Sequence, residues 1–93
     1  MEEKVRVHLM SSGRVQGVFY RMETKSAADH IGVSGWVKNR RDGRVEALVE
    51  GEKQRVEDLI QWCRKGPPAA RVHDVEVAWE PYRGEYLSFD VTY

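Results

Sequence analysis

The sequence predicts an α+β fold in which two helices cover one face of a single β-sheet. Two observations lead to this prediction. The apolar residues alternate between a period of two and a period of about 3.6 along the chain, and each helical stretch carries a single apolar stripe. A length of 93 residues is enough for one two-layer core and too short for two.

The first strand and the first helix are predicted from a change of period near residue 20. Apolar and polar residues alternate along Val5–Met10, as in a strand with one face toward a core. From Arg21 the small and apolar residues of one side have helical spacing: Thr24, Ala27, Ala28 and Ile31. Gly32 stands where a C-terminal capping glycine would end this helix.

A hairpin and a second helix follow. Residues 33–39 and 45–49 show the strand period, and Asp42-Gly43 between them is a turn signal. After Gly51-Glu52 the apolar residues lie at i, i+3, i+4 and i+7: Val56, Leu59, Ile60 and Cys63. The sequence Gly66-Pro67-Pro68 ends this second helix.

The last part of the chain predicts two more strands. Val75, Val77 and Trp79 share one phase, which puts Trp79 on the core side of the fourth strand. Residues 87–93 alternate in the same way and predict a short fifth strand at an edge. The resulting order, β-α-β-β-α-β with an extra C-terminal strand, is the ferredoxin-like two-layer sandwich, with both helices on one face of an antiparallel sheet.

Composition limits the classes of function. Fifteen basic and fifteen acidic side chains balance, so any preference for anions must be local, and we expect no nucleic-acid partner. No stretch approaches the roughly 18 apolar residues of a membrane span, and Met1–Lys4 contains no apolar leader, so we expect a cytoplasmic protein without a membrane partner. The lone Cys63 has no ligand-like spacing to any histidine, and we expect no metal or other cofactor.

The stretch from Gly13 to Arg21 joins the first strand to the first helix, and we interpret it as an anion cradle. Amides at a helix N-terminus are unpaired and lie at the positive end of the helix dipole. Gly13 and Gly17 permit the positive φ values with which successive amides converge on one anion. Arg21 adds a planar guanidinium that matches two phosphate oxygens. A purely structural turn is the alternative on these residues alone.

Two stretches resemble the signatures of the acylphosphatase family. The first is Gly13-Arg14-Val15-Gln16-Gly17-Val18-Phe19-Tyr20-Arg21; the second runs from Gly32 to Asn39 and continues with Asp42-Gly43 to Ala47. The resemblance spans nearly the whole chain and implies that residues 1–93 are a single acylphosphatase-like domain. It implies hydrolysis of acyl phosphates, which are carboxyl-phosphate mixed anhydrides, to a carboxylate and inorganic phosphate without a metal.

The resemblance also implies roles for individual residues. Arg21 matches the arginine that binds the phosphoryl group, and Asn39 matches the asparagine that orients the attacking water. The phosphate-binding amides would come from Val15, Gln16, Gly17, Val18, Phe19 and Tyr20. We expect inorganic phosphate to be both product and inhibitor, and the chain to act as a monomer. The aromatic residues at positions 19 and 20 leave the preferred acyl group open.

Elementary chemistry agrees with these roles. A carboxylate leaving group, whose conjugate acid has a pKa of about 4, needs no proton from the enzyme. Binding of the phosphoryl oxygens and positioning of one water then suffice. Asn39 suits the second task because an amide donates and accepts without changing charge. A residue that caps the hairpin turn is its alternative role.

Other functions remain as rivals at this stage. An RNA-binding domain of the same strand order would need aromatic residues on its first and third strands, and Val5–Met10 and Val45–Glu50 contain none. A non-catalytic anion or small-molecule binding module of this fold is the main alternative. Four cations around the hairpin could steer anionic substrate or simply be solvated: Lys38, Arg40, Arg41 and Arg44. Acid–base roles are not expected for His8, His30 and His73.

Overall fold

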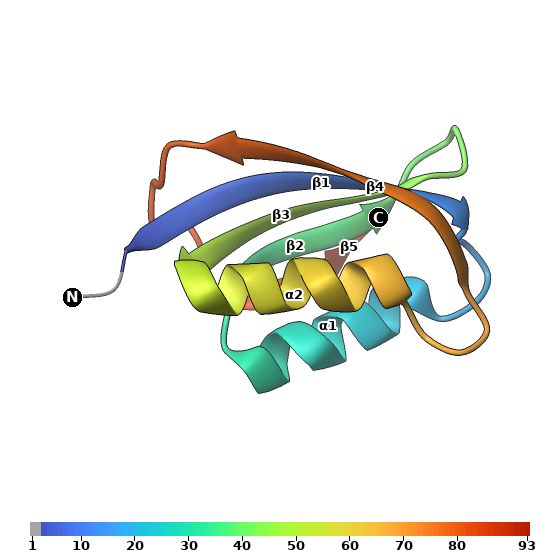
Figure 1. The fold of residues 1–93 in the computed structure, drawn as a ribbon, viewed down its shortest axis with the longest axis horizontal. Coiled ribbons are helices and arrows are strands. Elements are labelled where there is room, and N and C mark those ends of the chain that lie inside the picture. Colours follow the sequence, from blue (N-terminus) through green and yellow to red (C-terminus); the bar gives the residue numbers. More distant parts are fainter. Residues whose placement is uncertain (1–2) are drawn as a thin grey trace.

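The computed structural model describes residues 3–93. Met1 and Glu2, part of the polar start considered above, lie outside the described residues. The elements follow the predicted order: β1 (Lys4–Arg14), α1 (Tyr20–Ile31), β2 (Ser34–Asn39), β3 (Val45–Glu52), α2 (Lys53–Lys65), β4 (Arg71–Glu80) and β5 (Phe89–Thr92). Figure 1 shows α1 and α2 side by side on one face of the sheet, so the predicted two-layer α+β fold is confirmed.

The strand order in the sheet is β4-β1-β3-β2-β5. The first four of these strands pair in antiparallel fashion, whereas β5 lies parallel to β2. The sheet is therefore mixed, and the prediction of a wholly antiparallel sheet was wrong at this edge. The parallel pairing brings the end of the chain beside the end of β2, at the same end of the molecule as the loop that connects β1 to α1 (Figure 1).

The core lies between the inner face of the sheet and the two helices. The predicted stripe of α2 is buried in full: Val56, Leu59, Ile60 and Cys63. Val7 and Leu9 of β1 and Val37 of β2 belong to the same buried core on the side of the sheet. Burial raises the pKa of the Cys63 thiol to about 12, as expected for an inert core cysteine.

Trp79 lies on the predicted side of β4 but is not buried in the core. Its side chain is 51% exposed, although it points to the same face as Val75 and Val77. The reason is the place of β4 at the edge of the sheet, where α2 covers Val75 but leaves Trp79 beside Ile60 in an open groove. The phase of a strand predicts which face a residue occupies, but not whether another element covers it.

Gly13 lies in β1 and not in the loop that follows, which corrects the expected end of the strand at Met10. The pairing of β1 with β4 shifts register between Ser12 and Gly13. Gly13 has a φ of 112°, and a Cβ there would clash with the carbonyl oxygen of Arg71 and the amide nitrogen of His73. This glycine therefore permits a bulge against β4 and does not shape the cradle.

Neither described helix is long and apolar enough to cross a membrane.

Candidate active site

The loop between β1 and α1 spans residues 15–19. It depends on Gly17, whose φ is 73° and whose surroundings leave room for a side chain, so the left-handed backbone is what requires glycine. The amide of Val15 donates to the carbonyl oxygen of Gly13 over 3.1 Å and, contrary to expectation, is not free. Within residues 3–93 the amides of residues 16–19 donate to no other group, so they remain available to a ligand.

Tyr20 anchors the end of the loop in the core. Its hydroxyl donates to the carbonyl oxygen of Cys63 over 2.8 Å and accepts from the hydroxyl of Ser11 over 3.0 Å. Its ring packs against Trp62 with the centroids 5.9 Å apart. Burial raises the pKa of the Tyr20 phenol far above its ordinary value. The Tyr20 side chain is thus a structural anchor.

Phe19 precedes α1 and has a φ of 64°, the one positive φ of a non-glycine residue in the described chain. A bulky residue in this conformation costs about 1–3 kcal/mol, and such strain concentrates at functional sites. The Phe19 side chain is 73% exposed. The loop therefore turns Tyr20 inward and its neighbour outward.

Gln16 connects the loop to the β2–β3 hairpin. Its side-chain amide donates to the carbonyl oxygens of Arg40 and Arg44, at 2.7 and 2.9 Å. Both bonds go to the hairpin backbone, so they hold the hairpin tip against the loop. The sequence placed Gln16 in the loop but contained no signal for this link, because its partners lie 24 and 28 residues away.

Asn39, the last residue of β2, faces the loop. Its Oδ1 atom is buried and has no hydrogen-bond partner, which is true of no other buried side-chain nitrogen or oxygen among the described residues. An unpaired buried acceptor costs about 1–3 kcal/mol, so it marks a place where a ligand or water belongs. Asn39 lines one cavity of about 230 Å³ together with residues of the loop and of α1: Val15, Gly17, Phe19, Tyr20, Arg21 and Met22.

Arg21 lines this cavity from the first turn of α1, and the end of the chain holds its guanidinium group. Nη1 donates to the carbonyl oxygen of Thr92 over 3.2 Å, and the guanidinium carbon lies 4.8 Å from the centroid of the Tyr93 ring. No carboxylate of the described residues pairs with Arg21, so its charge remains available to an anion. The sequence did not predict the contacts with Thr92 and Tyr93.

The four cations of the hairpin differ in their ion pairs. Lys38 and Arg40 lie 3.9 and 3.2 Å from Glu46, and Arg44 pairs with Asp42 at 2.6 Å. Arg44 holds the pKa of Asp42 well below its usual range. Arg41 forms no ion pair with any described residue. The other three cations have carboxylate partners, which weakens the attraction that the hairpin can exert on an anionic substrate.

A second hollow, of about 550 Å³, shares one lining residue, Asn39, with the cavity that Arg21 lines. Its remaining lining residues come from the hairpin and the chain end: Lys38, Arg40, Arg41, Asp42 and Tyr93.

None of the three histidines lines the cavity of Arg21 and Asn39. His8 donates from Nε2 to Glu46 over 2.6 Å, in the opposite phase of β1 from the buried Val7 and Leu9. His30 and His73 are exposed.

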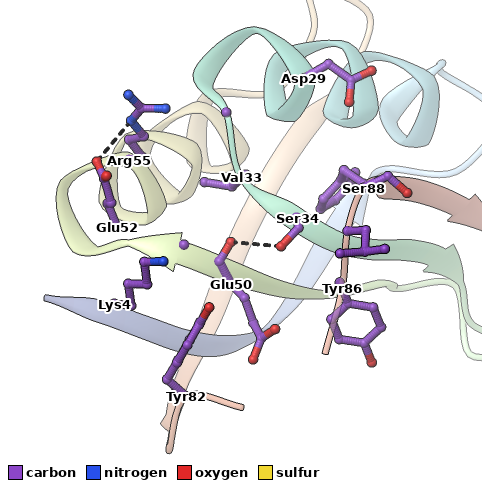
Figure 2. Close-up of a pocket in the computed structure, with 14 residues that line it drawn as sticks. Lys4, Asp29, Val33, Ser34, Glu50, Glu52, Arg55, Tyr82, Tyr86 and Ser88 are labelled. Atoms are coloured by element: carbon purple, nitrogen blue, oxygen red, sulfur yellow. Dashed lines mark hydrogen bonds and ion pairs between the residues drawn. The ribbon is translucent and has the colours of Figure 1, made fainter. Parts of the chain in front are cut away.

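Another hollow, of about 570 Å³, lies elsewhere, and neither Arg21 nor Asn39 lines it. Figure 2 shows Glu50 there, with its carboxylate directed away from the helices toward the segment that carries Tyr82 and Tyr86. That carboxylate accepts hydrogen bonds from three backbone amides of this segment, those of Arg83, Gly84 and Glu85.

Known proteins are similar to this chain in both sequence and fold. Residues 7–91 match the sequence model of the family described as Acylphosphatase. An acylphosphatase of Pyrobaculum calidifontis is 54% identical over 90 residues, which cover 96% of this chain and 82% of that protein. An acylphosphatase of Pelotomaculum thermopropionicum is 47% identical over 90 residues, with 97% and 98% of the two chains covered.

Among solved structures, the acylphosphatase of Bacillus subtilis superposes with a TM-score of 0.92 at 34% identity, covering 96% of this chain and 99% of that one. These similarities confirm the predicted family and enzyme class, and they disfavour a non-catalytic module of the same fold. The chain belongs to the acylphosphatase family, whose enzymes hydrolyse acyl phosphates.

Proposed function

We propose that Arg21, Asn39 and the amides of Gln16 to Tyr20 form the site at which this enzyme hydrolyses acyl phosphates. One observation carries the proposal. A single cavity is lined by two loop residues with free amides, Gly17 and Phe19, by Arg21, which has no carboxylate partner, and by Asn39, whose buried Oδ1 atom lacks a hydrogen bond. Polar groups without partners do not stabilise the fold, and buried ones destabilise it, so these three features are explained if an anion and a water occupy the cavity.

The phosphoryl group would bind to the loop amides and to Arg21. Amides that precede a helix direct their hydrogens and the positive end of the helix dipole at one point, which stabilises a dianionic phosphoryl group. The Arg21 guanidinium adds charge-assisted hydrogen bonds in a planar arrangement. Its contacts with Thr92 and Tyr93 hold it in one orientation, so little side-chain entropy is lost when substrate binds.

The attacking water would be held by Asn39. The free Oδ1 atom accepts a hydrogen bond from the water, and this bond orients the water so that a lone pair of the water oxygen points toward phosphorus. The water oxygen forms a bond to phosphorus while the bond from phosphorus to the acyl oxygen breaks, and the two lie in line. The acyl group leaves as a carboxylate with the bonding electron pair, and the water's proton leaves with the phosphate product.

This chemistry needs no acid from the protein. The carboxylate is a stable anion at neutral pH, whereas an alkoxide would have to be protonated as it leaves. The side chains that line the cavity include no Asp, Glu or His. Alkyl phosphates should therefore be very poor substrates.

Release of phosphate from acetyl phosphate and from glycerol phosphate, at matched concentrations between pH 5 and pH 8, tests this function. We expect rapid turnover of acetyl phosphate with a flat pH profile, and negligible turnover of glycerol phosphate. Similar rates on the two substrates, or a bell-shaped profile centred near the pKa of a histidine, would rule out the acid-free mechanism.

We further propose that residues 1–93 act as one domain and as a monomer in the cytoplasm, and that inorganic phosphate inhibits by occupying the cradle. Gel filtration tests the monomeric state, and competition by phosphate against acetyl phosphate tests the inhibition.

A further inference from the structure

Two exposed apolar side chains, Phe19 and Met22, line the cavity that contains Arg21 and Asn39. Phe19 is 73% exposed and Met22 is 62% exposed. Phe19 is the residue that immediately precedes α1, and Met22 lies in the first turn of that helix, so both border the cavity from the same end of α1. Exposed apolar side chains are ordinary when scattered, but a pair at the rim of a reactive cavity is available to a ligand.

The burial of the lining groups defines a floor and a mouth for this cavity. The Oδ1 atom of Asn39 is buried, and the residues Val15 and Tyr20 are buried as well. Phe19 and Met22 are largely exposed while they line the same space. Asn39 therefore belongs to the floor, and the two apolar side chains form the mouth.

In-line displacement decides which part of the substrate occupies the mouth. The attacking water and the leaving group lie on opposite sides of phosphorus. If Asn39 holds the water at the floor, the acyl group must project through the mouth. The second hollow, which meets the cradle only at Asn39 and contains Arg41, is then on the side of the water and not of the acyl group.

We propose that Phe19 and Met22 form an acyl-binding subsite, the acyl lip, that gives the enzyme a preference for apolar, and above all aromatic, acyl phosphates. The inference rests on the proposed function, because it uses the water position assigned to Asn39. A phenyl group packs on the Phe19 ring and the Met22 thioether, whereas an acetyl methyl group is too short to cover either.

The backbone at residue 19 supports this role. Its φ of 64° is a conformation that glycine or asparagine adopts with less strain, yet the chain places a phenylalanine there. The side chain gains no core burial in return, since the adjacent Tyr20 fills that place. A strained aromatic residue held in solvent at the rim of a reactive cavity is explained if its ring contacts the substrate.

The test compares kcat/KM for benzoyl phosphate and for acetyl phosphate in the whole chain. Two variants probe the acyl lip: Met22→Ala, on a helix that tolerates alanine, and Phe19→Gly, which suits the positive φ. In each variant we expect kcat/KM for benzoyl phosphate to fall more than that for acetyl phosphate, so that their ratio decreases by about three- to tenfold.

Leu87→Ala is the matched control, because Leu87 is a fully exposed apolar residue that lines the distant hollow of Figure 2. We expect it to change neither rate. Circular dichroism establishes that each variant is folded.

Inhibition by inorganic phosphate separates failure of the acyl lip from failure of the site, since phosphate has no acyl group. A wild-type ratio in folded variants that are still inhibited by phosphate would overturn the acyl lip and leave the proposed function intact. A ratio that falls only because acetyl phosphate is hydrolysed faster would overturn it too. Absence of phosphate inhibition in the wild-type chain would instead contradict the cradle itself.

Discussion

Backbone amides converge in two regions of this molecule, and the two regions differ in what the amides meet. In the segment between β4 and β5, the amides of Arg83, Gly84 and Glu85 donate to the carboxylate of Glu50 over 2.9–3.0 Å. In the cradle, the amides of residues 16–19 meet no group of the described chain. The protein supplies its own anion in the first region and leaves the second open for a substrate.

The two arginines of these regions differ in the same way. Arg6 contacts three carboxylates, those of Glu50, Glu80 and Glu85, and is almost fully buried. Burial acts against its charge, but these carboxylates more than compensate and raise the pKa of the Arg6 guanidinium. Arg21 has only a carbonyl group and an aromatic ring as partners, which orient it without neutralising it. A satisfied charge network stabilises the fold, whereas unsatisfied groups are retained for binding.

Arg21→Gln should have the largest effect on activity. Glutamine is shorter and uncharged, so the phosphoryl group loses its cationic partner, and we expect turnover of acetyl phosphate to fall by about 10³-fold or more. Inhibition by phosphate should weaken in parallel. Arg14→Gln is a control, because Arg14 is an exposed arginine at the end of β1. A folded Arg21→Gln protein with wild-type phosphate inhibition would contradict the assignment.

Asn39→Ala should lower kcat by about 10²-fold with little change in the inhibition constant of phosphate, because Asn39 contacts the water rather than the anion. Thermal unfolding provides a second measurement. Removal of a buried acceptor that lacks a partner should leave the stability unchanged or raise it slightly. Equal losses of rate and phosphate affinity would mean that Asn39 binds the anion.

Glu50→Gln should have the opposite profile, with a loss of stability and little loss of activity per folded molecule. The carboxylate is buried and satisfies three amides and Arg6, so we expect the free energy of unfolding to fall by about 2–4 kcal/mol. Denaturant unfolding measures the loss. Wild-type stability in the variant would show that the segment between β4 and β5 does not depend on this carboxylate.

We also expect the stability difference between the wild-type protein and Glu50→Gln to depend on pH. Burial opposes ionisation of Glu50, but the bonds from Arg83, Glu85, Gly84 and Arg6 prevail and lower its pKa below the ordinary value of 4.5. The stabilisation is therefore complete above pH 4.5 and is lost as the pH falls through the lower, folded-state pKa. The difference in stability between wild type and Glu50→Gln should shrink as the pH decreases below about 4.5. A difference that grows on acidification would contradict this assignment.

The smallest effect should come from chelation. Within residues 3–93 no three His, Cys, Asp or Glu side chains lie close enough together to hold a metal ion. We expect excess EDTA to leave the rate of acetyl phosphate hydrolysis unchanged. A loss of activity that magnesium restores would show that the phosphoryl group needs a cation besides Arg21.

Local properties of the sequence were sufficient for most of the fold. The period of the apolar residues predicted all five strands and both helices, and the predicted stripe of α2 proved to be buried in full. These features depend on residues within one or two turns of each other. The cradle could be anticipated for the same reason, since Gly17, the start of α1 and Arg21 are neighbours along the chain. The roles of Arg21 and Asn39 stay predictions until their variants are measured.

The features that only the tertiary structure decided all depend on partners far apart in the chain. Gly13 serves the pairing of β1 with β4, and Trp79 is exposed because β4 lies at an edge. Arg21 is oriented by a residue 71 positions away, and Glu50 accepts bonds from amides more than 30 positions away. Neither periodicity nor local spacing contains such information, because it arises only when strands pair and loops cross the finished sheet.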